Sequence, residues 1–206
     1  MKSIEDKILN KLYRRGKGYA FSSSDFIKEF PINNIEKALS SLAQKGKIRR
    51  LTRGIYDYPE YSPFLKKELS PDIRQVADAI SRKFNLKIEA SGDTALNILG
   101  ISTQVPGKYI YLSNGPKKTY RILNNISLEF KSSALKNIGF RYKESSLIVQ
   151  ALKSLGKENI TDDVKAKIKE RIDSKTCSNI LEDTKTSDTW IYETIKQICK
   201  KELSNG

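Results

Sequence analysis

The sequence predicts an α+β protein with an N-terminal winged helix-turn-helix, followed by a mixed α/β domain that has a small, mostly antiparallel sheet and a helical C-terminal tail. Three observations lead to this prediction. Short helical segments precede a glycine-centred hairpin within residues 1–60, alternating strand patterns lie between residues 86 and 131, and helical stripes alone follow residue 147. We therefore expect a winged helix-turn-helix domain over residues 1–60 and an α/β domain with its tail over residues 61–206.

The first two helices are predicted from their ends. Ser3 and Asp6 have the spacing of a capping box, an apolar stripe follows them, and Gly16 ends the helix. Ser22 begins a short second helix, which Pro31 stops because proline cannot continue a helix. Two helices are thus expected before the segment that carries most of the basic charge.

A third helix and a hairpin complete the predicted N-terminal domain. The helix is expected between Asn33 and Gly46, with an apolar face turned to the core. Two strands, residues 48–51 and 55–58, follow around a glycine turn at residues 52–54 and form a hairpin. This order of elements is that of a winged helix-turn-helix, whose third helix enters the DNA major groove and whose wing contacts the backbone or the minor groove.

The chain is strongly basic, with 38 Lys+Arg, 24 Asp+Glu, a net charge of +14 and no histidine. A positive charge of this size favours a polyanionic partner, most often nucleic acid. In the N-terminal domain the surplus falls in one window, because no acidic residue lies between Glu36 and Asp57. That window covers the outer face of the third helix and the hairpin.

The residues expected to bind DNA lie in this window. Polar side chains on the helix can hydrogen-bond to base edges or phosphates, and basic side chains on the wing can neutralise phosphates. The predicted DNA-binding residues are Asn34, Lys37, Ser41, Gln44 and Lys45 on the helix and Lys47, Arg49, Arg50 and Arg53 on the wing. A second basic group lies at the end of the first helix and consists of Lys11, Arg14, Arg15 and Lys17. These residues are as well explained by a solvated helix end as by contacts with phosphates.

The rest of the chain reads as a linker, a sheet and a helical tail. Residues 59–71 are rich in proline and serine, which is typical of a linker or of the first edge of a second domain. Strands are expected at residues 86–89, 108–113, 120–122 and 126–131, and a turn at Asn124-Asn125 joins the last two. In the tail, Trp190 is assigned to the core of the last helix rather than to a partner contact.

The composition excludes most familiar catalysis. Without histidine there is no Ser-His-Asp triad, no Cys-His pair and no histidine-based zinc site. Asp72 and Glu89 resemble a nuclease carboxylate pattern, but Ser91 stands where the catalytic lysine would be. The acid pairs Asp162-Asp163 and Glu182-Asp183 are assigned to helix ends rather than to Mg²⁺. We therefore expect no catalytic residue, no metal and no cofactor.

The cysteines and the N-terminus point to a cytoplasmic protein. Cys177 and Cys199 are isolated and fit neither a zinc site nor a disulfide framework, so reduced intracellular thiols are expected. The N-terminus carries charges throughout, and no run of about 18 apolar residues occurs. A soluble, cytoplasmic protein with no membrane partner is the expectation.

Two stretches resemble a known family. Arg49 to Pro59 follows the pattern basic-x-x-x-Arg-Gly-aliphatic-Tyr-x-x-Pro, which on a winged helix-turn-helix resembles the AbiEi-type antitoxins of abortive-infection, type IV toxin–antitoxin systems. Residues 95–106 and 109–115 resemble that family's A-x-x-x-L-G stretch and the strand ending in Asn-Gly that follows it. The resemblance spans roughly residues 3–131.

The resemblance implies an antitoxin with two tasks. The N-terminal domain would bind inverted repeats of double-stranded DNA in its own promoter and repress the operon. The C-terminal domain would counter a nucleotidyltransferase-like toxin, with or without direct contact. Two other functions stay open from the residues alone: a winged-helix transcriptional regulator with a ligand-sensing C-terminal domain, and a DNA-targeted nuclease.

Overall fold

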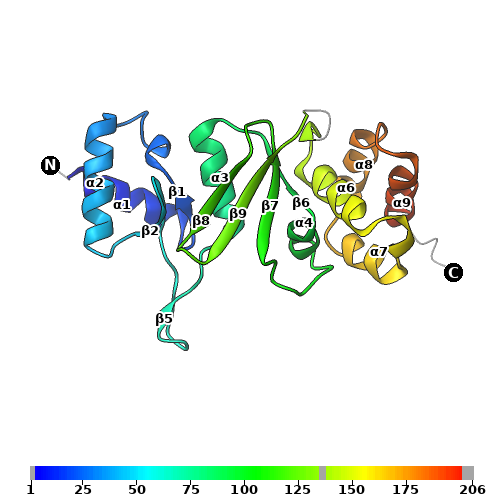
Figure 1. The fold of residues 1–206 in the computed structure, drawn as a ribbon, viewed down its shortest axis with the longest axis horizontal. Helices are drawn as coiled ribbons and strands as arrows, with labels where there is room; N and C mark the ends of the chain where they lie inside the picture. The colour runs from blue at the N-terminus through cyan, green and yellow to red at the C-terminus, as the bar shows by residue number, and fades with distance from the viewer. Residues whose placement is uncertain (1–2, 135–137, 201–206) are drawn as a thin grey trace. The chain divides into compact units, whose positions relative to one another are not determined.

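The computed structural model describes residues 3–134 and 138–200 of the 206-residue chain, shown in Figure 1. The chain folds as two compact units, and the α+β class predicted from the sequence is confirmed. The first unit comprises residues 1–88 and 119–128, and the second comprises residues 89–118 and 129–206.

The first unit begins as a winged helix-turn-helix. In chain order its elements are α1 (Ile4–Arg15), β1 (Ala20–Phe21), the 3-10 helix η1 (Ser23–Asp25), α2 (Ile32–Gln44), β2 (Arg49–Thr52) and β3 (Ile55–Asp57). The three strands form an antiparallel sheet in the order β1-β3-β2. The first and third predicted helices and the wing are therefore present. The expected second helix between Ser22 and Pro31 is wrong, because this segment forms only the three-residue η1 followed by turns. β1 is an added strand, too short to show an alternating pattern.

The caps explain where these helices begin. Ser3 and Asp6 form the predicted capping box on α1. The expected start of the third helix at Asn33 is wrong, because α2 begins at Ile32 with the Pro31 carbonyl accepting its first hydrogen bonds. Pro31 is the N-cap of α2, and its ψ of 139° is extended, so the helix begins directly after it.

One apolar core holds α1, α2 and the wing together. Ile8 and Leu12 of α1 meet Ile35 and Leu39 of α2, and all four side chains are almost completely buried. Phe21 of β1 closes the core. This core fixes which face of α2 stays outside.

The predicted domain boundary at residue 60 falls inside the first unit. Residues 59–71, expected as a linker or edge, contain a short hairpin of β4 (Tyr61–Ser62) and β5 (Lys67–Glu68). The helix α3 (Ile73–Phe84) follows and packs on β1 and η1. Its Arg82 pairs with Asp25 at 2.7 Å and donates to the Ala20 carbonyl at 2.9 Å. These contacts join residues about 60 positions apart, so no local sequence pattern predicts that α3 belongs to this unit.

A second hairpin, formed by β8 (Lys118–Ile122) and β9 (Ile126–Ser132), also reaches the wing. Leu123 and Asn124 have φ of 49° and 67° and form its turn, one residue before the predicted Asn124-Asn125 turn. The Leu123 backbone N–H donates to the Leu51 carbonyl on β2 at 3.0 Å. Residues 119–128 therefore belong with the first unit.

The larger sheet has four strands in the order β6-β7-β9-β8. Their bounds are β6 (Ile88–Ser91), β7 (Lys108–Ser113), β8 (Lys118–Ile122) and β9 (Ile126–Ser132). The helices of the second unit are α4 (Asp93–Ile98), α6 (Lys143–Leu155), η2 (Lys157–Asn159), α7 (Asp162–Lys169), α8 (Ser174–Asp183) and α9 (Thr189–Cys199). Trp190, expected in the core, is half-buried in the first turn of α9. In the described part of the chain, no helix has both the length and the apolar character needed to cross a membrane.

The prediction of two reduced thiols is wrong. Cys177 of α8 and Cys199 of α9 form a disulfide, with their Cα atoms 5.6 Å apart. The two helices pack against each other, which brings cysteines 22 positions apart into contact. Their spacing matches no short motif, so this pairing depends on the fold of the tail.

The acidic residues considered for metal binding have structural contacts. Asp72 caps α3 by accepting from the Arg74 backbone N–H at 2.8 Å. Asp183 accepts from the backbone N–H groups of Arg141 and Tyr142, both at 3.0 Å. Among residues 3–134 and 138–200, no three His, Cys, Asp or Glu side chains are grouped as a metal ion would require.

Candidate nucleic-acid interface

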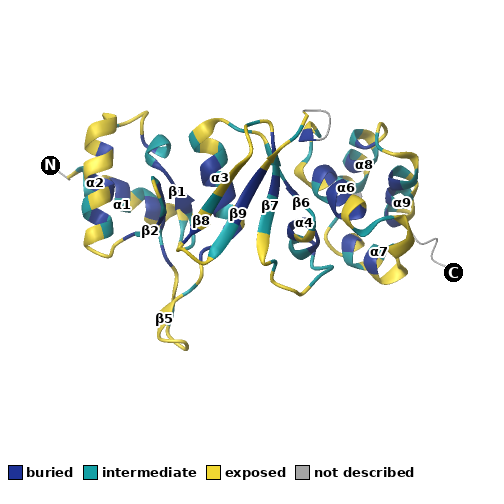
Figure 2. Ribbon diagram, in the orientation of Figure 1, coloured by how far each residue is buried: buried dark blue, intermediate teal, exposed yellow. Residues whose placement is uncertain are grey.

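The helix α2 presents one polar, exposed face. Its apolar residues Ile35, Leu39 and Leu42 are buried in the core, which follows from their helical spacing. The opposite face is exposed in Figure 2 and includes Asn34, Lys37, Gln44 and Lys45. The periodicity of the sequence therefore placed these four side chains correctly on the outside of the helix.

Ser41 of α2 and Lys45, the residue directly after this helix, also contact α1. The Lys45 ammonium lies 2.6 Å from the Glu5 carboxylate. Hydrogen bonds from Lys45 and then Ser41 lower the pKa of Glu5 below its ordinary value. Ser41 is half-buried, so it faces α1 rather than solvent. Lys45 remains exposed and can exchange Glu5 for a phosphate.

A basic hollow lies between α2 and the tip of the wing. It has a volume of about 340 Å³, and Arg50, Arg53 and Lys83 line it together with the acid Glu36. Arg50 and Arg53 are exposed on the wing, as predicted. We name this set of residues the wing hollow. Three cations beside one acid make it suitable for an anion such as a phosphate.

Lys83 also lines the wing hollow, although it was not among the residues predicted from the sequence. It belongs to α3, and its ammonium donates to the Gly54 carbonyl at the wing tip at 3.4 Å. Gly54 has φ of +71°, and a Cβ at this position would collide with the Lys83 ammonium. Since α3 lies outside the basic window of the sequence, only the tertiary contact brings Lys83 to the wing.

Arg49 has a different environment from its neighbours. Its guanidinium contacts both carboxylate oxygens of Asp57, at 2.6 and 3.1 Å, and donates to the Leu69 carbonyl at 3.0 Å. It also pairs with Glu68 at 3.3 Å, and its side chain is only 16% exposed. Arg49 is therefore a structural residue at the base of the wing rather than part of the exposed surface.

This pairing involves a buried acid. Burial raises the pKa of the Asp57 carboxyl above its ordinary value, although the hydrogen bonds and charge of Arg49 oppose that shift. Burial also works against the charged guanidinium, but Asp57 and Glu68 together outweigh it and the pKa of Arg49 is raised. Each of the two groups therefore stabilises the charged form of the other.

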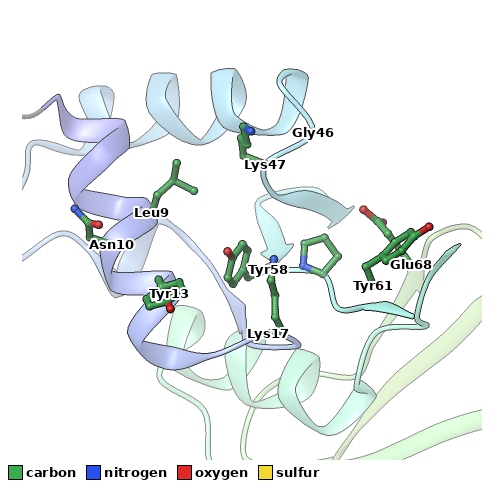
Figure 3. Close-up of a pocket in the computed structure, with 10 residues that line it drawn as sticks. Leu9, Asn10, Tyr13, Lys17, Gly46, Lys47, Tyr58, Tyr61 and Glu68 are labelled. Atoms are coloured by element: carbon green, nitrogen blue, oxygen red, sulfur yellow. The ribbon is translucent and has the colours of Figure 1, made fainter. Parts of the chain in front are cut away.

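A second hollow lies at the other end of the wing. Figure 3 shows it between α1, the Gly46-Lys47 turn after α2, and the start of the β4–β5 hairpin. Its volume is about 480 Å³, and its walls carry three tyrosines and two lysines: Tyr13, Tyr58, Tyr61, Lys17 and Lys47. The Lys17 ammonium lies 3.5 Å from the centre of the Tyr58 ring. We name this set the tyrosine hollow.

The predicted residues therefore form several groups. Asn34, Lys37 and Gln44 lie on the exposed face of α2, Arg50 and Arg53 line the wing hollow, and Lys47 lines the tyrosine hollow. Of the second basic group, Lys11 forms an ion pair with Glu29, and Arg15 lies 5.5 Å from the centre of the Tyr19 ring.

Comparisons with known proteins give a matching family model and distant similarity to solved structures. No curated protein matches the sequence. The crystal structure of the RV2827C protein from Mycobacterium tuberculosis shares 12% sequence identity, covers 96% of this chain and 82% of its own, and has a TM-score of 0.40. A model described as a family of unknown function, DUF6088, matches residues 7–180. That match spans most of the chain, and the protein therefore belongs to the DUF6088 family.

Proposed function

We propose that this protein is a DNA-binding antitoxin of a type IV toxin–antitoxin system, which represses its own operon and acts in the cytoplasm. The observation that carries the DNA-binding part is the exposed polar face of α2 beside the three cations of the wing hollow. A helix with such a face is the element that a winged helix-turn-helix places in the major groove.

The two parts of this surface have different tasks in the proposal. On α2, Asn34 and Gln44 offer amide groups to base edges, and Lys37 offers an ammonium. Around the wing hollow, Arg50, Arg53 and Lys83 neutralise phosphates. Each neutralised phosphate releases counterions, so affinity falls with salt and the number of phosphate contacts sets the slope.

The antitoxin part rests on the resemblance of residues 49–59, 95–106 and 109–115 to the AbiEi type. The functional partner would be a nucleotidyltransferase-like toxin encoded beside this protein. Co-expression of the full chain with the product of that neighbouring gene should restore growth. Continued growth arrest would contradict the antitoxin function and leave DNA binding to be judged separately.

DNA binding is tested with a duplex taken from the region upstream of the protein's own gene. Arg53→Ala should weaken binding to all duplexes and lower the slope of log K against log salt by about one. Asn34→Ala should instead reduce the preference for the upstream duplex over an unrelated one. The control is Lys157→Ala, an exposed lysine of η2 in the second unit, which should change neither.

A double charge reversal gives the sharpest test. Arg50→Glu with Arg53→Glu replaces two cations of the wing hollow by acids and should abolish binding, as measured by fluorescence anisotropy. Unchanged affinity in a variant that is still folded would place the DNA surface elsewhere.

A further inference from the structure

The β4–β5 hairpin carries an exposed apolar tip. At the tip Phe64 is 92% exposed and Leu65 49%, and Tyr61 at the base of the hairpin is 57% exposed. Figure 2 shows the hairpin exposed along most of its length. Exposed apolar groups gathered at one place are typical of a contact surface, because the fold gains nothing from leaving them in water.

The hairpin has a regular structure that holds this tip in place. Tyr61 pairs with Glu68, and Ser62 with Lys67. The Leu69 backbone N–H donates to the Glu60 carbonyl at 2.8 Å. At the tip, the Leu65 N–H donates to the Ser62 hydroxyl at 3.2 Å, and Lys66 takes the left-handed conformation that closes the turn.

Arg49 ties the hairpin to the wing. One side of its guanidinium binds Asp57 at the end of β3, and Nη1 reaches Glu68 and the carbonyl of Leu69. The base of the hairpin is therefore held to the same sheet that carries the wing. Because Arg49 neutralises Glu68, the two lysines just before it, Lys66 and Lys67, dominate the charge of this strand.

The tyrosine hollow connects the end of α2 to this hairpin. In Figure 3, Lys47 lies beside Gly46 at the end of α2, and Tyr61 and Glu68 lie at the hairpin base. Lys17 lines the same hollow. Two lysines, Lys17 and Lys47, therefore lie between the end of α2 and the base of the hairpin, and the acid of this hollow, Glu68, pairs with Arg49.

We propose that the hairpin is a second DNA-contacting element, which inserts its tip between base pairs in the minor groove next to the major groove read by α2. This inference rests on the proposed DNA-binding function. Proteins that kink DNA insert Phe, Leu or Pro between base steps, with basic residues on the phosphates beside them. The tip provides Pro63, Phe64 and Leu65, and Lys66 and Lys67 follow directly.

The experiment compares the full chain with a Phe64→Ala, Leu65→Ala double variant. The duplex from upstream of the gene carries a fluorescence donor and acceptor at its two ends. Wild type should shorten the end-to-end distance on binding, and the double variant should lose this bend and about tenfold in affinity while keeping its salt slope. Its melting temperature should not change, because both side chains are exposed.

The matched control is Val105→Ala, which truncates an apolar side chain of the second unit that is also highly exposed. It should bend the duplex as wild type does. Lys66→Ala with Lys67→Ala should lower the salt slope and leave the bend in place.

The failures can be told apart. No binding by wild type contradicts the proposed function itself. Binding with the same bend in the double variant overturns only the role of the hairpin. A change in the mass of the DNA-free double variant, measured by light scattering, would overturn it too, because the tip would then be a contact between protein chains.

Discussion

At the scale of single residues, Arg49 shows what sequence patterns can and cannot supply. It stands beside Arg50 and in the same basic window as Arg53, so the window predicted one role for all three. Strand alternation does predict a less exposed Arg49, because this residue lies two positions before the buried Leu51 and therefore on the same side of β2. Its partners could not be predicted, since Asp57 depends on the hairpin register and Glu68 on a hairpin hidden in an apparent linker.

Arg49→Ala should therefore destabilise the fold more than it weakens DNA binding. Removing one partner of a buried ion pair leaves the other charge uncompensated, which costs about 3 kcal/mol. Urea denaturation at pH 7 should show this loss, and Arg50→Ala, which removes an exposed neighbour, should show almost none.

The same variant should have a distinctive pH dependence. The pKa of Asp57 is already raised by burial, and loss of Arg49 raises it further. The native state then holds a proton that the unfolded chain releases from pH 3.8 upward, so stability falls as the pH rises through that range. The loss in Arg49→Ala should be smaller at pH 4 than at pH 7, and an equal loss at both values would contradict this account.

At the scale of elements, the sequence predicted those with strong local signals. The capping box of α1, the exposed face of α2 and the glycine turn of the wing all depend on residues a few positions apart. The strands β1, β4 and β5 were missed because two residues show no alternation. The Cys177–Cys199 pairing was missed because it requires α8 and α9 to pack first.

Reduction of that disulfide should destabilise the second unit. Closing a loop of this length in the unfolded chain contributes about 3 kcal/mol in the chain-entropy model. Thermal unfolding with and without dithiothreitol measures the loss. Cys177→Ser should melt like the reduced protein and no longer respond to reductant. Since disulfides are rare in reducing compartments, the proposed cytoplasmic location would make the stability of this unit depend on the redox state of the cell.

At the scale of the whole molecule, sequence reasoning found two parts but divided them at the wrong place. The proline-rich segment at residues 59–71 resembled a linker, whereas α3 after it belongs to the first unit through Arg82. For the same reason the candidate surface was incomplete, because Lys83 reaches the wing only when α3 is in position. Charge and periodicity predicted a basic, polar surface on α2 and the wing. Long-range packing determined which side chains belong to that surface.

A truncation tests this division. A fragment of residues 1–60 lacks α3 and the ion pair between Arg82 and Asp25, whereas a fragment of residues 1–88 keeps both. The longer fragment should unfold cooperatively in a circular-dichroism melt, and the shorter one should not. Equal cooperativity of the two fragments would restore the boundary at residue 60.

The disulfide also makes residues 177–199 a closed covalent ring. Lys185 lies inside that ring, in the exposed connection between α8 and α9. Cleavage of the backbone after Lys185 therefore leaves a single molecule under oxidising conditions, because the bridge still joins the two pieces. The last helix stays attached to the protein for as long as that sulfur bond lasts.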